Sequence, residues 1–567
     1  MSGGIGGAPA DQEDPRADLI WGTVPRLVED AALRHGSAEA LVDGAVRLTY
    51  GQLAEEVDRY ARGFLAAGLA AGDRVAVWAP NCAEWMLAAL GLVRAGGVLV
   101  PLNTRFKGGE AAFIIRDAGA TMLVTVRGFL GADYPAMLAG QDTGDLARII
   151  LLRDEGGATG DGTAADGASA AAPVTQLRAF LGAGEGVDPA ESAARAAAVQ
   201  PDDVSDLIFT SGTTGHPKGA SATHAQSLRT FGTWSSIVGL TAGDRYLVVN
   251  PFFHTFGYKA GILACLMAGA TVVPEPVFDA SAVMARIGAE HISVLPGPPT
   301  LYQTLLSDPR RAEQDLSSLR LGVTGAAVVP VELVQAMRDE LGFDTVLTAY
   351  GLTESCGTVT MCRRSDPPEI VAATSGRAIP GLEVRAVAGG TDVAPGEPGE
   401  IVVRGYTVMP GYWGNEAATA EAIDAEGWLH TGDIGVLDRA GNVTITDRVK
   451  DMYVVGGFNA YPAEIEGILR GHEAVAQVAV VGVPDDRMGE VGCAYIVPTE
   501  AAAAGTEPVE LGRAILSWSR GSMANYKVPR GVGLVDALPV NASGKVLKRE
   551  LRQRHADGAD TVVTNES

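Results

Sequence analysis

The stretch DLIFTSGTTGHPKGA, residues 206–220, decides how the rest of this chain is interpreted. Its apolar start, which ends at Thr210, predicts a buried strand, and most of the residues that follow are glycine, serine or threonine. Small residues let backbone N–H groups crowd around one anion, and hydroxyl groups add further donors. The stretch therefore predicts a strand that leads into a phosphate-binding loop. The candidate phosphate-binding residues are Thr210, Ser211, Gly212, Thr213, Thr214, Gly215 and Lys218.

The order of residues in this loop excludes one large class of nucleotide-binding proteins. A Walker A loop ends in Gly-Lys followed by Ser or Thr, whereas this chain has Pro217-Lys218-Gly219. The P-loop NTPases are therefore excluded. An ordinary Gly/Ser-rich turn is the plain alternative, but the hydroxyls, glycines and lysine that follow an apolar strand favour anion binding.

Short apolar runs alternate with amphipathic helices on both sides of the loop. Helical periodicity begins near Val24, where apolar residues recur at i, i+3, i+4 and i+7. This alternation is typical of β-α-β units that form a mainly parallel sheet, so we predict an α/β fold. From Glu400 onward, Gly-containing turns between apolar runs predict antiparallel strands. The predicted strands of the parallel part are RVAVWA (74–79), GVLVPL (97–102), TMLVTV (121–126), RIILL (148–152), VSDLIFT (204–210), YLVVN (246–250), ATVVP (270–274), ISVLP (292–296), LRLGVTG (319–325) and TVLTAYG (345–351).

The length and texture of the chain predict more than one domain. A chain of 567 residues is too long for a single core. The pattern changes between Asp447 and Lys450, and a low-complexity run at 153–172 predicts a surface loop. We expect the following divisions: a flexible tail at 1–18, a large core domain at 19–447, a C-terminal swivelling domain at 448–555 and a tail at 556–567.

The composition excludes several classes of protein. A formal net charge of −24 repels phosphate backbones, so we do not expect nucleic acid as a partner. Five cysteines without a CxxC pair favour a reducing cytoplasm over a disulfide framework. The acidic N-terminus lacks the pattern of a secretory signal. The most apolar stretch, 85–102, is interrupted by Arg94 and Gly96-Gly97, so no integral membrane segment is expected, although membrane contact by a surface patch stays open.

Four further motifs follow the loop: TAYGLTE (348–354), GWLHTGDIG (427–435), ITDRVKDMYVVGGFNAYPAEIE (445–466) and LPVNASGKVLKREL (538–551). Each motif alone has a plain structural interpretation: a helix cap, a turn, a helix start and a solvent-exposed lysine. Together and in this order they resemble the motifs of the AMP-forming adenylating superfamily, which contains acyl-CoA synthetases, peptide-synthetase adenylation domains and luciferases. The resemblance extends from LTYGQL at 48–53 nearly to the C-terminus.

This resemblance implies both a fold and residue roles. The implied fold is a large N-terminal domain with mainly parallel sheets and helices plus a small distorted β-barrel, followed by a small mobile α+β C-terminal domain. The implied roles are stacking on the base for Tyr350 beside Gly351, a phosphate contact for Thr353, Mg²⁺ binding for Glu354, ribose binding for Asp433 and Arg448, catalysis by Lys545, a hinge at Lys450, and a thiol tunnel lined by Gly456 and Gly457.

Two more segments resemble those that surround the nucleotide and the acid in this superfamily. GVTGAAVVP places Gly325, Ala326 and Ala327 beside the nucleotide. NPFFHTFGYKAG places His254 at the carboxylate, where it would gate the approach of the thiol. A satisfied core histidine in an aromatic cluster is the plain alternative for His254.

The acyl pocket is expected to form around the second of these segments. Its expected lining residues are Trp234, Phe256, Tyr258, Lys259, Gly325 and Ser355. A lysine is unusual in such a set. Lys259 either meets a distal oxygen of the acid or points from a helix into solvent.

The resemblance implies an ATP-dependent carboxylic acid:CoA ligase, which forms an acyl-AMP, releases pyrophosphate and transfers the acyl group to the thiol of CoA. Several segments are similar to those of actinobacterial CoA ligases of the fatty-acid type, including ligases that activate the indane propanoate left by steroid ring degradation. The implied cofactors are ATP, Mg²⁺ and CoA. The expected partners are small molecules, and a homodimer is left open.

Three alternatives share the same motifs. The acceptor could be a carrier-protein thiol or an amine, and the acid could be as unusual as nitrite in a diazotisation. A regulatory protein could bind nucleotide without chemistry. The joint presence of Lys545, Glu354, Asp433 and Arg448 argues against this last alternative, because binding alone does not need Lys545.

Overall fold

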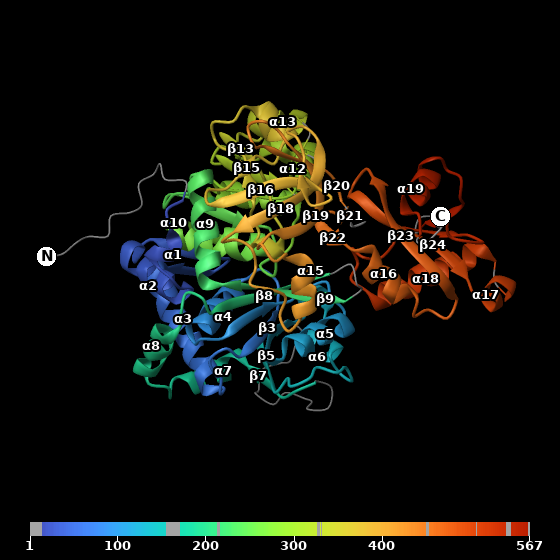
Figure 1. Ribbon diagram of the computed structural model, residues 1–567. Helices are drawn as coiled ribbons and strands as arrows, with labels where there is room; N and C mark the ends of the chain where they lie inside the picture. The colour runs from blue at the N-terminus through green and yellow to red at the C-terminus, as the bar shows by residue number, and fades with distance from the viewer. Residues whose placement is uncertain are drawn as a thin grey trace. The chain divides into compact units, whose positions relative to one another are not determined.

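The computed structural model describes residues 14–154, 171–211, 216–325, 329, 331–448, 453–505, 507–539 and 546–564. The chain divides into two compact units, shown in Figure 1. Unit 1 comprises Met1–Thr104, Ala111–Phe209 and Gly219–Thr446, and unit 2 comprises Arg105–Glu110, Thr210–Lys218 and Asp447–Ser567.

A seven-stranded sheet with the order β7-β6-β5-β3-β4-β8-β9 forms one layer. Its pairs β3–β4, β3–β5, β4–β8, β5–β6 and β6–β7 are parallel. The central strands are buried almost throughout, which explains why they are continuous apolar runs in the sequence. The strands are β3 (Arg74–Trp78), β4 (Val98–Pro101), β5 (Ala120–Arg127), β6 (Arg148–Asp154), β7 (Val174–Gln176), β8 (Val204–Ser211) and β9 (Pro217–Thr223).

Two four-stranded sheets in unit 1 are joined through Val294. Their orders are β10-β11-β1-β2 and β12-β13-β14-β15, and Val294 forms parallel bridges to Tyr246 of the first and Leu321 of the second. The predicted strand at 292–296 is not a regular strand, although Ser293 and Leu295 also form backbone hydrogen bonds, to Arg245 and Leu321. The strands are β1 (Glu39–Asp43), β2 (Val46–Thr49), β10 (Arg245–Val248), β11 (Thr271–Pro274), β12 (Leu321–Gly325), β13 (Thr345–Tyr350), β14 (Thr360–Met361) and β15 (Arg377–Ala378).

Helices of unit 1 cover these sheets, and their starts follow from capping residues. Thr49 and Thr223 each form a capping box with a glutamine three residues later. The helices are α1 (Ala17–Ile20), α2 (Val24–His35), α3 (Tyr50–Ala66), α4 (Ala83–Arg94), α5 (Gly108–Ala118, whose first residues belong to unit 2), α6 (Tyr134–Met137), α7 (Leu177–Gly184), α8 (Pro189–Ala198), α9 (His224–Val238), α10 (Ala264–Ala268), α11 (Ala280–Glu290), α12 (Pro299–Ser307), α13 (Val331–Asp339), α14 (Pro368–Ala373) and α15 (Glu416–Ala422). Short helical turns are η1 (Phe129–Gly131), the π-helix η2 (Phe256–Leu263), η3 (Pro309–Glu313) and η4 (Thr353–Ser355).

The stretch at 85–102 is the buried helix α4 followed by the strand β4, as the interruption by Arg94 and Gly96-Gly97 predicts. None of the helices in the described ranges has the length and apolar character needed to cross a membrane.

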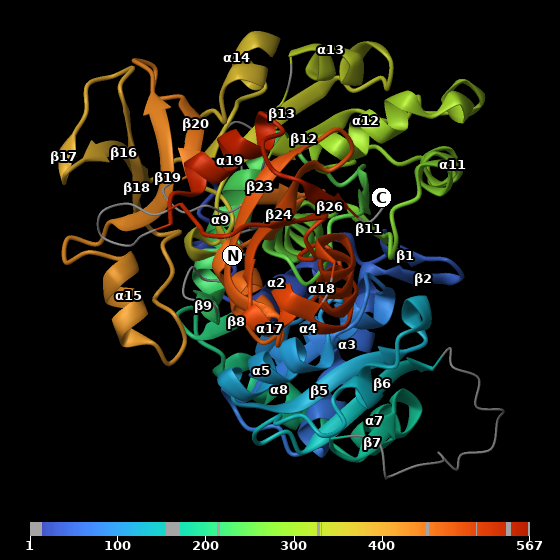
Figure 2. The same ribbon diagram turned by 90° about the vertical axis from the view of Figure 1, so that its right-hand side faces the viewer.

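An antiparallel sheet with the order β17-β16-β18-β19-β20 completes unit 1. Figure 2 shows β16, β18 and β19 side by side with α15 beneath them. Val359, Ile401, Val403 and Val443 form its small core. This sheet stands where the distorted β-barrel is expected. Its strands are β16 (Leu382–Ala388), β17 (Thr391–Asp392), β18 (Pro398–Gly405), β19 (Leu429–Leu437) and β20 (Val443–Arg448).

Unit 2 is built on a six-stranded sheet with the order β22-β21-β24-β25-β26, in which β23 also pairs with β24. Alternate residues of β23 enter different cores, because Val480 packs with α16 and α18 whereas Val481 packs with Leu551 of α19. The strands are β21 (Tyr453–Val455), β22 (Phe458–Ala460), β23 (Val475–Asp485), β24 (Gly489–Pro498), β25 (Gly531–Leu534) and β26 (Val562–Thr564); the helices are α16 (Pro462–Leu469), α17 (Glu500–Gly505), α18 (Pro508–Ser522) and α19 (Lys548–Ala556). The predicted fold class, α/β with parallel-rich sheets and an α+β C-terminal part, is confirmed.

Candidate active site

Tyr350 and Asp433 lie against each other in unit 1, although they come from different sheets. Tyr350 ends β13, and its hydroxyl donates a hydrogen bond of 2.7 Å to Oδ2 of Asp433 on β19. Asp433 is buried, and Tyr350 packs against the core of the antiparallel sheet. The structure therefore brings together the residues expected at the base and at the ribose.

The part of β19 that carries Asp433 is held by Glu400 on the neighbouring strand β18. Glu400 Oε1 accepts from the N–H of Gly432 at 3.1 Å, and Glu400 Oε2 lies 3.0 Å from Nδ1 of His430. The hydrogen bond to Glu400 raises the pKa of the His430 imidazole, and Asp424 adds to this effect. One carboxylate thus fixes both the backbone and a side chain next to Asp433.

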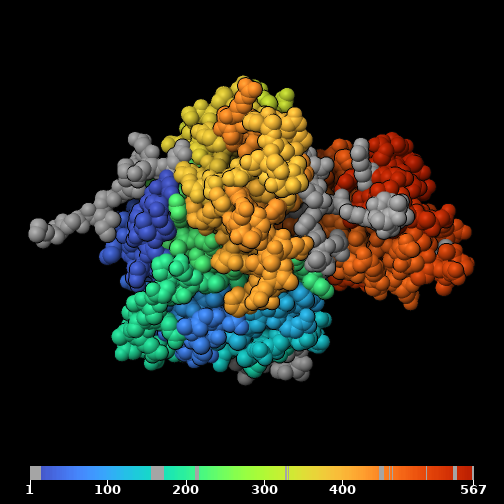
Figure 3. Space-filling model, viewed as in Figure 1, coloured from blue at the N-terminus to red at the C-terminus, as the bar shows by residue number. Residues whose placement is uncertain are grey.

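Glu354 lies in the short turn η4 and is hydrogen-bonded to Tyr412. The Tyr412 hydroxyl donates a hydrogen bond of 2.9 Å to Glu354 Oε1. The residue after it, Trp413, donates its N–H to the carbonyl of Gly219 at 2.7 Å, which attaches this segment to β9. In Figures 1 and 3 this orange segment lies against the green and blue part of unit 1. Tyr412 therefore orients Glu354 from a segment that pairs with β9, the strand that follows the phosphate loop.

The backbone around Glu354 is packed so closely that glycine is required there. A Cβ atom on Gly351 would lie 2.4 Å from the carbonyl oxygen of Gly357, and a Cβ on Gly325 would lie 2.4 Å from that of Ala349. Both distances are far inside van der Waals contact. The two glycines expected beside the nucleotide thus have a packing requirement of their own.

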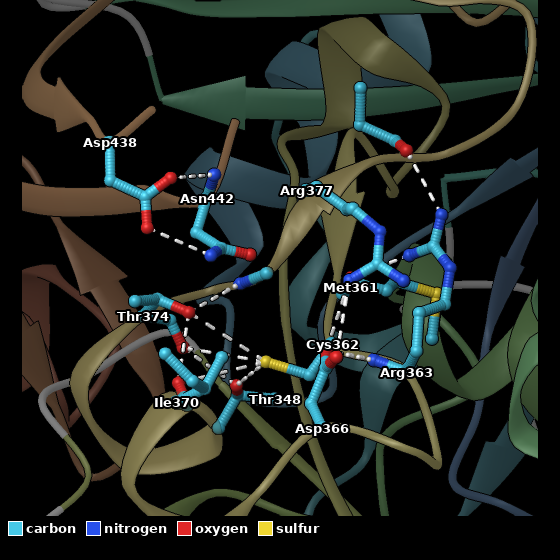
Figure 4. A network of polar contacts seen from close by, with 12 residues as sticks. Thr348, Met361, Cys362, Arg363, Asp366, Ile370, Thr374, Arg377, Asp438 and Asn442 are labelled. Atoms are coloured by element: carbon cyan, nitrogen blue, oxygen red, sulfur yellow. Dashed lines mark hydrogen bonds and ion pairs between the residues drawn. The ribbon is translucent and has the colours of Figure 1, made fainter. Parts of the chain in front are cut away.

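A polar network behind β13 supports the end of this strand (Figure 4). Thr348, two residues before Tyr350, lies with its Oγ1 3.1 Å from Sγ of Cys362. Asp366 accepts from the backbone N–H of Arg363 at 2.6 Å and forms an ion pair of 3.2 Å with Arg377. The network connects β13, β14 and β15, so the position of Tyr350 is fixed from behind as well as by Asp433.

His254 precedes the π-helix η2, and its ring reaches solvent. Its Nδ1 accepts from the N–H of Phe256 at 3.3 Å. The plain alternative of a core histidine is therefore wrong. The protein around the ring still lowers the pKa of His254 by restricting its hydration, so the imidazole is neutral near pH 7.

The aromatic residues expected to line the acyl pocket come from α9 and η2, and two of them, Trp234 and Phe256, are in contact. Trp234 is fully buried and meets Phe256 edge-to-face, with ring centroids 6.2 Å apart. Tyr258 is also fully buried and packs against Trp85. The indole N–H of Trp234 and the hydroxyl of Tyr258 have no hydrogen-bond partner among the residues that the structure describes. The hydroxyl of Ser355, in contrast, donates to a backbone carbonyl of its own turn.

Lys259 contradicts both expectations stated for it. Its side chain is 1% exposed, so it does not point into solvent, and its ammonium lies 2.9 Å from Oδ1 of the equally buried Asp206. It also donates to Sγ of Cys356 at 3.5 Å. Its position on a buried face of η2 explains the difference. The ammonium group is engaged by Asp206 and Cys356 rather than directed at a distal oxygen of an acid.

Several predicted site residues lie outside the described residues: Lys545, Lys450, Gly212, Thr213, Thr214, Gly215, Ala326 and Ala327. For Ser211 and Arg448 the structure gives only the backbone, in β8 and β20. Thr210 and Lys218 lie in β8 and β9, on the two sides of the phosphate loop. Thr353 lies in η4 beside Glu354.

Gly456 and Gly457, expected in the thiol tunnel, form the two-residue turn between β21 and β22. Their φ angles are +53° and +87°, which only glycine adopts readily, and this turn type suits a tight antiparallel hairpin. A Cβ on Gly456 would also lie 2.5 Å from Cε of Met488.

Three residues of the site were not found from the sequence. Tyr412 stands in a Gly-flanked turn without a recognisable motif, and Glu400 was used only to mark a change of pattern. Asp206 carried a usable signal, because a carboxylate at the start of an otherwise apolar buried strand needs a cation.

The arrangement is suited to hold a nucleotide and its charge. Asp433 and Tyr350 offer polar groups for a nucleoside, and Glu354 offers a hard carboxylate oxygen. No group of three or more His, Cys, Asp or Glu side chains that could hold a metal ion occurs among the residues with a described position. A single oriented carboxylate nevertheless fits Mg²⁺, which proteins commonly bind through one or two carboxylates together with substrate phosphates.

Comparison with known families gives two matches in chain order. The model of the AMP-binding enzymes matches residues 28–413, and the model of the AMP-binding enzyme C-terminal domain matches residues 464–545. The first match alone covers more than half of the chain.

Curated relatives and solved structures match nearly the whole chain. The 3-[(3aS,4S,7aS)-7a-methyl-1,5-dioxo-octahydro-1H-inden-4-yl]propanoyl:CoA ligase of Rhodococcus jostii is 48% identical over 94% of this chain and 98% of the relative. The protein of the same name from Mycobacterium tuberculosis is 46% identical, again over 94% and 98%. Among structures, o-succinylbenzoate CoA synthetase of Bacillus subtilis has a TM-score of 0.76 at 26% identity, over 95% of this chain and 99% of that chain.

Proposed function

This chain belongs to the AMP-binding enzyme family, and from that premise we propose that it activates a propanoate carried on a fused, keto-bearing ring system. It is an ATP-dependent carboxylic acid:CoA ligase of the AMP-forming kind. The prediction of the family and of the ligase reaction from sequence motifs is confirmed.

The reaction has two steps. A carboxylate oxygen of the acid attacks the α-phosphorus of ATP. The bond between the α-phosphorus and the oxygen that bridges it to the β-phosphate breaks, and pyrophosphate leaves. The CoA thiol then attacks the acyl carbon and AMP leaves. Because both reactants of the first step are anions in a protein of net charge −24, the protein must mainly neutralise charge and position groups in line.

We assign these tasks to the residues as follows. Lys545 bridges the carboxylate and the α-phosphate, and the loop from Thr210 to Lys218 binds the departing phosphates. Glu354 holds Mg²⁺, which would spread the phosphate charge when bound. Asp433 and Arg448 bind the ribose. For the second step the C-terminal domain swivels about Lys450, which removes Lys545 and presents the Gly456-Gly457 turn to the thiol.

The observation that carries the choice of acid is the 48% identity, over nearly the whole chain, to a ligase whose name describes a dioxo-octahydroindenyl propanoate. The unpartnered donors of the expected acyl pocket support it. Buried polar groups normally have partners, so the Trp234 N–H and the Tyr258 hydroxyl suit an acid that brings carbonyl acceptors. An unsubstituted fatty acid would leave both donors unpaired, which costs binding energy.

The test is acid-dependent ATP–pyrophosphate exchange with matched acids: a bicyclic dioxo-propanoate, its fully deoxygenated analogue and a linear fatty acid. We expect the dioxo acid to be preferred by kcat/KM, and Tyr258→Phe to reduce this preference by roughly fivefold, the equivalent of one hydrogen bond. Equal rates for the dioxo and deoxygenated acids would contradict the proposed substrate class but not the ligase reaction.

The acceptor is tested in the same assay by mass spectrometry of the product. With CoA present we expect an acyl-CoA, and without it an enzyme-bound acyl-AMP. An amide or a carrier-bound thioester formed in preference to acyl-CoA would contradict the assignment of CoA. We place the enzyme in the cytoplasm, where ATP and CoA occur; its five cysteines, all unpaired and buried, fit a reducing compartment.

A further inference from the structure

A buried ion pair lies between the expected acyl pocket and the strand that leads to the phosphate loop. Lys259 and Asp206 are each 1% exposed, and their charged atoms are 2.9 Å apart. Asp206 Oδ2 also accepts from the hydroxyl of Ser205 at 2.7 Å. Burial alone would lower the pKa of Lys259, but Asp206 and the sulfur of Cys356 outweigh burial and raise the pKa above its usual value. The lysine is therefore charged at neutral pH.

The ammonium of Lys259 contacts two further segments besides its own helix. Asp206 lies on β8, four residues before Thr210, where the phosphate loop begins. Cys356, whose Sγ is 3.5 Å from Nζ, directly follows the η4 turn that carries Glu354. Lys259 itself lies on η2, which begins two residues after His254. One positive charge thus joins the segments expected to bind the phosphates, the metal and the acid.

Stability alone does not explain a charge in this place. Buried ion pairs can often be replaced by apolar residues of similar size without loss of stability, because desolvation offsets much of the attraction. The nearby His224 does not share the charge, since burial lowers its pKa to about 4. The helix that carries Lys259 is a π-helix, a form that is rare and frequent at functional sites.

We propose that Lys259 is a positioning residue for adenylation, which through Asp206 and Cys356 sets the relative placement of the phosphate loop strand, the Glu354 turn and the acyl-pocket helix. This inference rests on the proposed ligase function. Lys259 touches no reactant itself. Its loss would let the three segments shift independently, and a displacement of about 1 Å at reacting groups costs on the order of 10²-fold in rate.

The test compares four variants with the wild type. Lys259→Met leaves Asp206 buried without its cation, so it is expected to lower the thermal midpoint. The double variant Lys259→Met with Asp206→Asn removes both charges and is expected to recover most of that midpoint. Cys356→Ala keeps the ion pair and removes the contacts of Sγ with the Lys259 ammonium and with the hydroxyl of Ser227. Arg94→Met is the matched control, because Arg94 is a mostly buried cation paired with Glu29 and Asp58 away from the site.

Two measurements are made on each variant whose circular dichroism shows a folded chain. The first is the rate of acid-dependent ATP–pyrophosphate exchange. The second is the affinity for Mg²⁺, titrated calorimetrically into enzyme that holds a non-hydrolysable ATP analogue, which does not depend on turnover. A residue that only stabilises the fold would change the thermal midpoint without changing this affinity per folded molecule.

We expect the double variant to exchange about 10²-fold more slowly than wild type and to bind Mg²⁺ roughly tenfold more weakly. Cys356→Ala is expected to lose about fivefold in exchange rate, and Arg94→Met to match wild type in both measurements. A folded double variant, or a folded Cys356→Ala if the double variant does not fold, with wild-type exchange and Mg²⁺ affinity would overturn the proposal. Absence of exchange by wild-type enzyme with every acid would instead refute the proposed function.

Discussion

The hydrogen bond between Tyr412 and Glu354 gives the sharpest prediction about the metal site. Tyr412→Phe removes one oxygen atom and with it the 2.9 Å bond to Glu354 Oε1, while the ring keeps its place. A hydrogen bond to a charged group contributes about 1.5–3 kcal/mol. Both residues are half-buried, so we take the lower value, ~1.5 kcal/mol, which corresponds to roughly a tenfold change in an equilibrium constant.

This loss is expected to weaken Mg²⁺ binding rather than ATP binding. Removing a group that orients a metal-binding residue typically costs about 10–100-fold in metal affinity, in agreement with the value from the hydrogen bond. The assay is pyrophosphate exchange at fixed ATP with Mg²⁺ varied. We expect the half-saturating Mg²⁺ concentration to rise about tenfold and the rate at saturation to recover to near the wild-type value.

The matched control is Tyr134→Phe, which also removes one hydroxyl hydrogen bond, 2.9 Å long, to the carbonyl of Thr104. It should leave the Mg²⁺ dependence as in wild type. If Tyr412→Phe and Tyr134→Phe show the same Mg²⁺ dependence, either Glu354 does not hold the metal or Tyr412 does not orient it.

The remaining predictions concern the catalytic lysine, the pH dependence of stability at His430 and a glycine. Lys545→Ala should slow adenylate formation by about 10²–10³-fold but affect thioester formation from a preformed acyl-AMP much less; equal losses in both steps would refute its role. The hydrogen bond to Glu400 raises the pKa of His430 in the folded state above its unfolded pKa of about 6.5. The charged imidazole therefore stabilises the fold fully below about pH 6.5, and this stabilisation is lost as the pH rises through the pKa of the folded state. The difference in thermal midpoint between wild type and His430→Gln should therefore shrink from acid to alkaline pH; a constant difference would exclude the linkage. Gly351→Ala, whose Cβ would lie 2.4 Å from a carbonyl oxygen, should destabilise unit 1 by about 1–3 kcal/mol in chemical denaturation, whereas Gly182→Ala, with open space at its Cβ, should not.

The elements of the parallel sheets were predictable because their strands are buried on both faces. Runs such as 74–79 and 121–126 are mostly apolar and correspond to β3 and β5. The run at 292–296 is similarly apolar, and Ser293, Val294 and Leu295 form backbone hydrogen bonds to β10 or β12, but only Val294 is a bridge residue. An apolar run indicates that the segment is buried. Whether it forms a regular strand depends on which strand edges lie beside it, and sequence periodicity does not contain that information.

The residues expected to bind the nucleotide were predictable where a motif marks them. The residues that orient them through hydrogen bonds were not predictable. Tyr350 and Asp433 were placed at one site from motifs 83 residues apart, and they are hydrogen-bonded. Tyr412 was not found because its role arises only when its segment pairs with the strand after the phosphate loop. Such contacts join residues distant in sequence, and neither residue type nor local spacing records them.

Lys259 is a second case in which the sequence contained the residues but not their pairing. A lysine within an apolar segment permitted two ordinary interpretations, a ligand contact or a solvent-facing side chain. Its true partner, Asp206, was within the quoted phosphate-loop stretch, but the pairing became visible only once η2 and β8 were placed in space.

The central claim, that the acid receives the adenylyl group of ATP before it is passed to the thiol, is tested most directly by isotope transfer. The enzyme is incubated with ATP, CoA and an acid in which both carboxylate oxygens are ¹⁸O, and the products are analysed by mass spectrometry. Because the carboxylate oxygen that attacks the α-phosphorus stays with the phosphorus when AMP leaves, we predict one ¹⁸O atom in each AMP formed. Label in inorganic phosphate with ADP as the product, or AMP without label, would contradict the account.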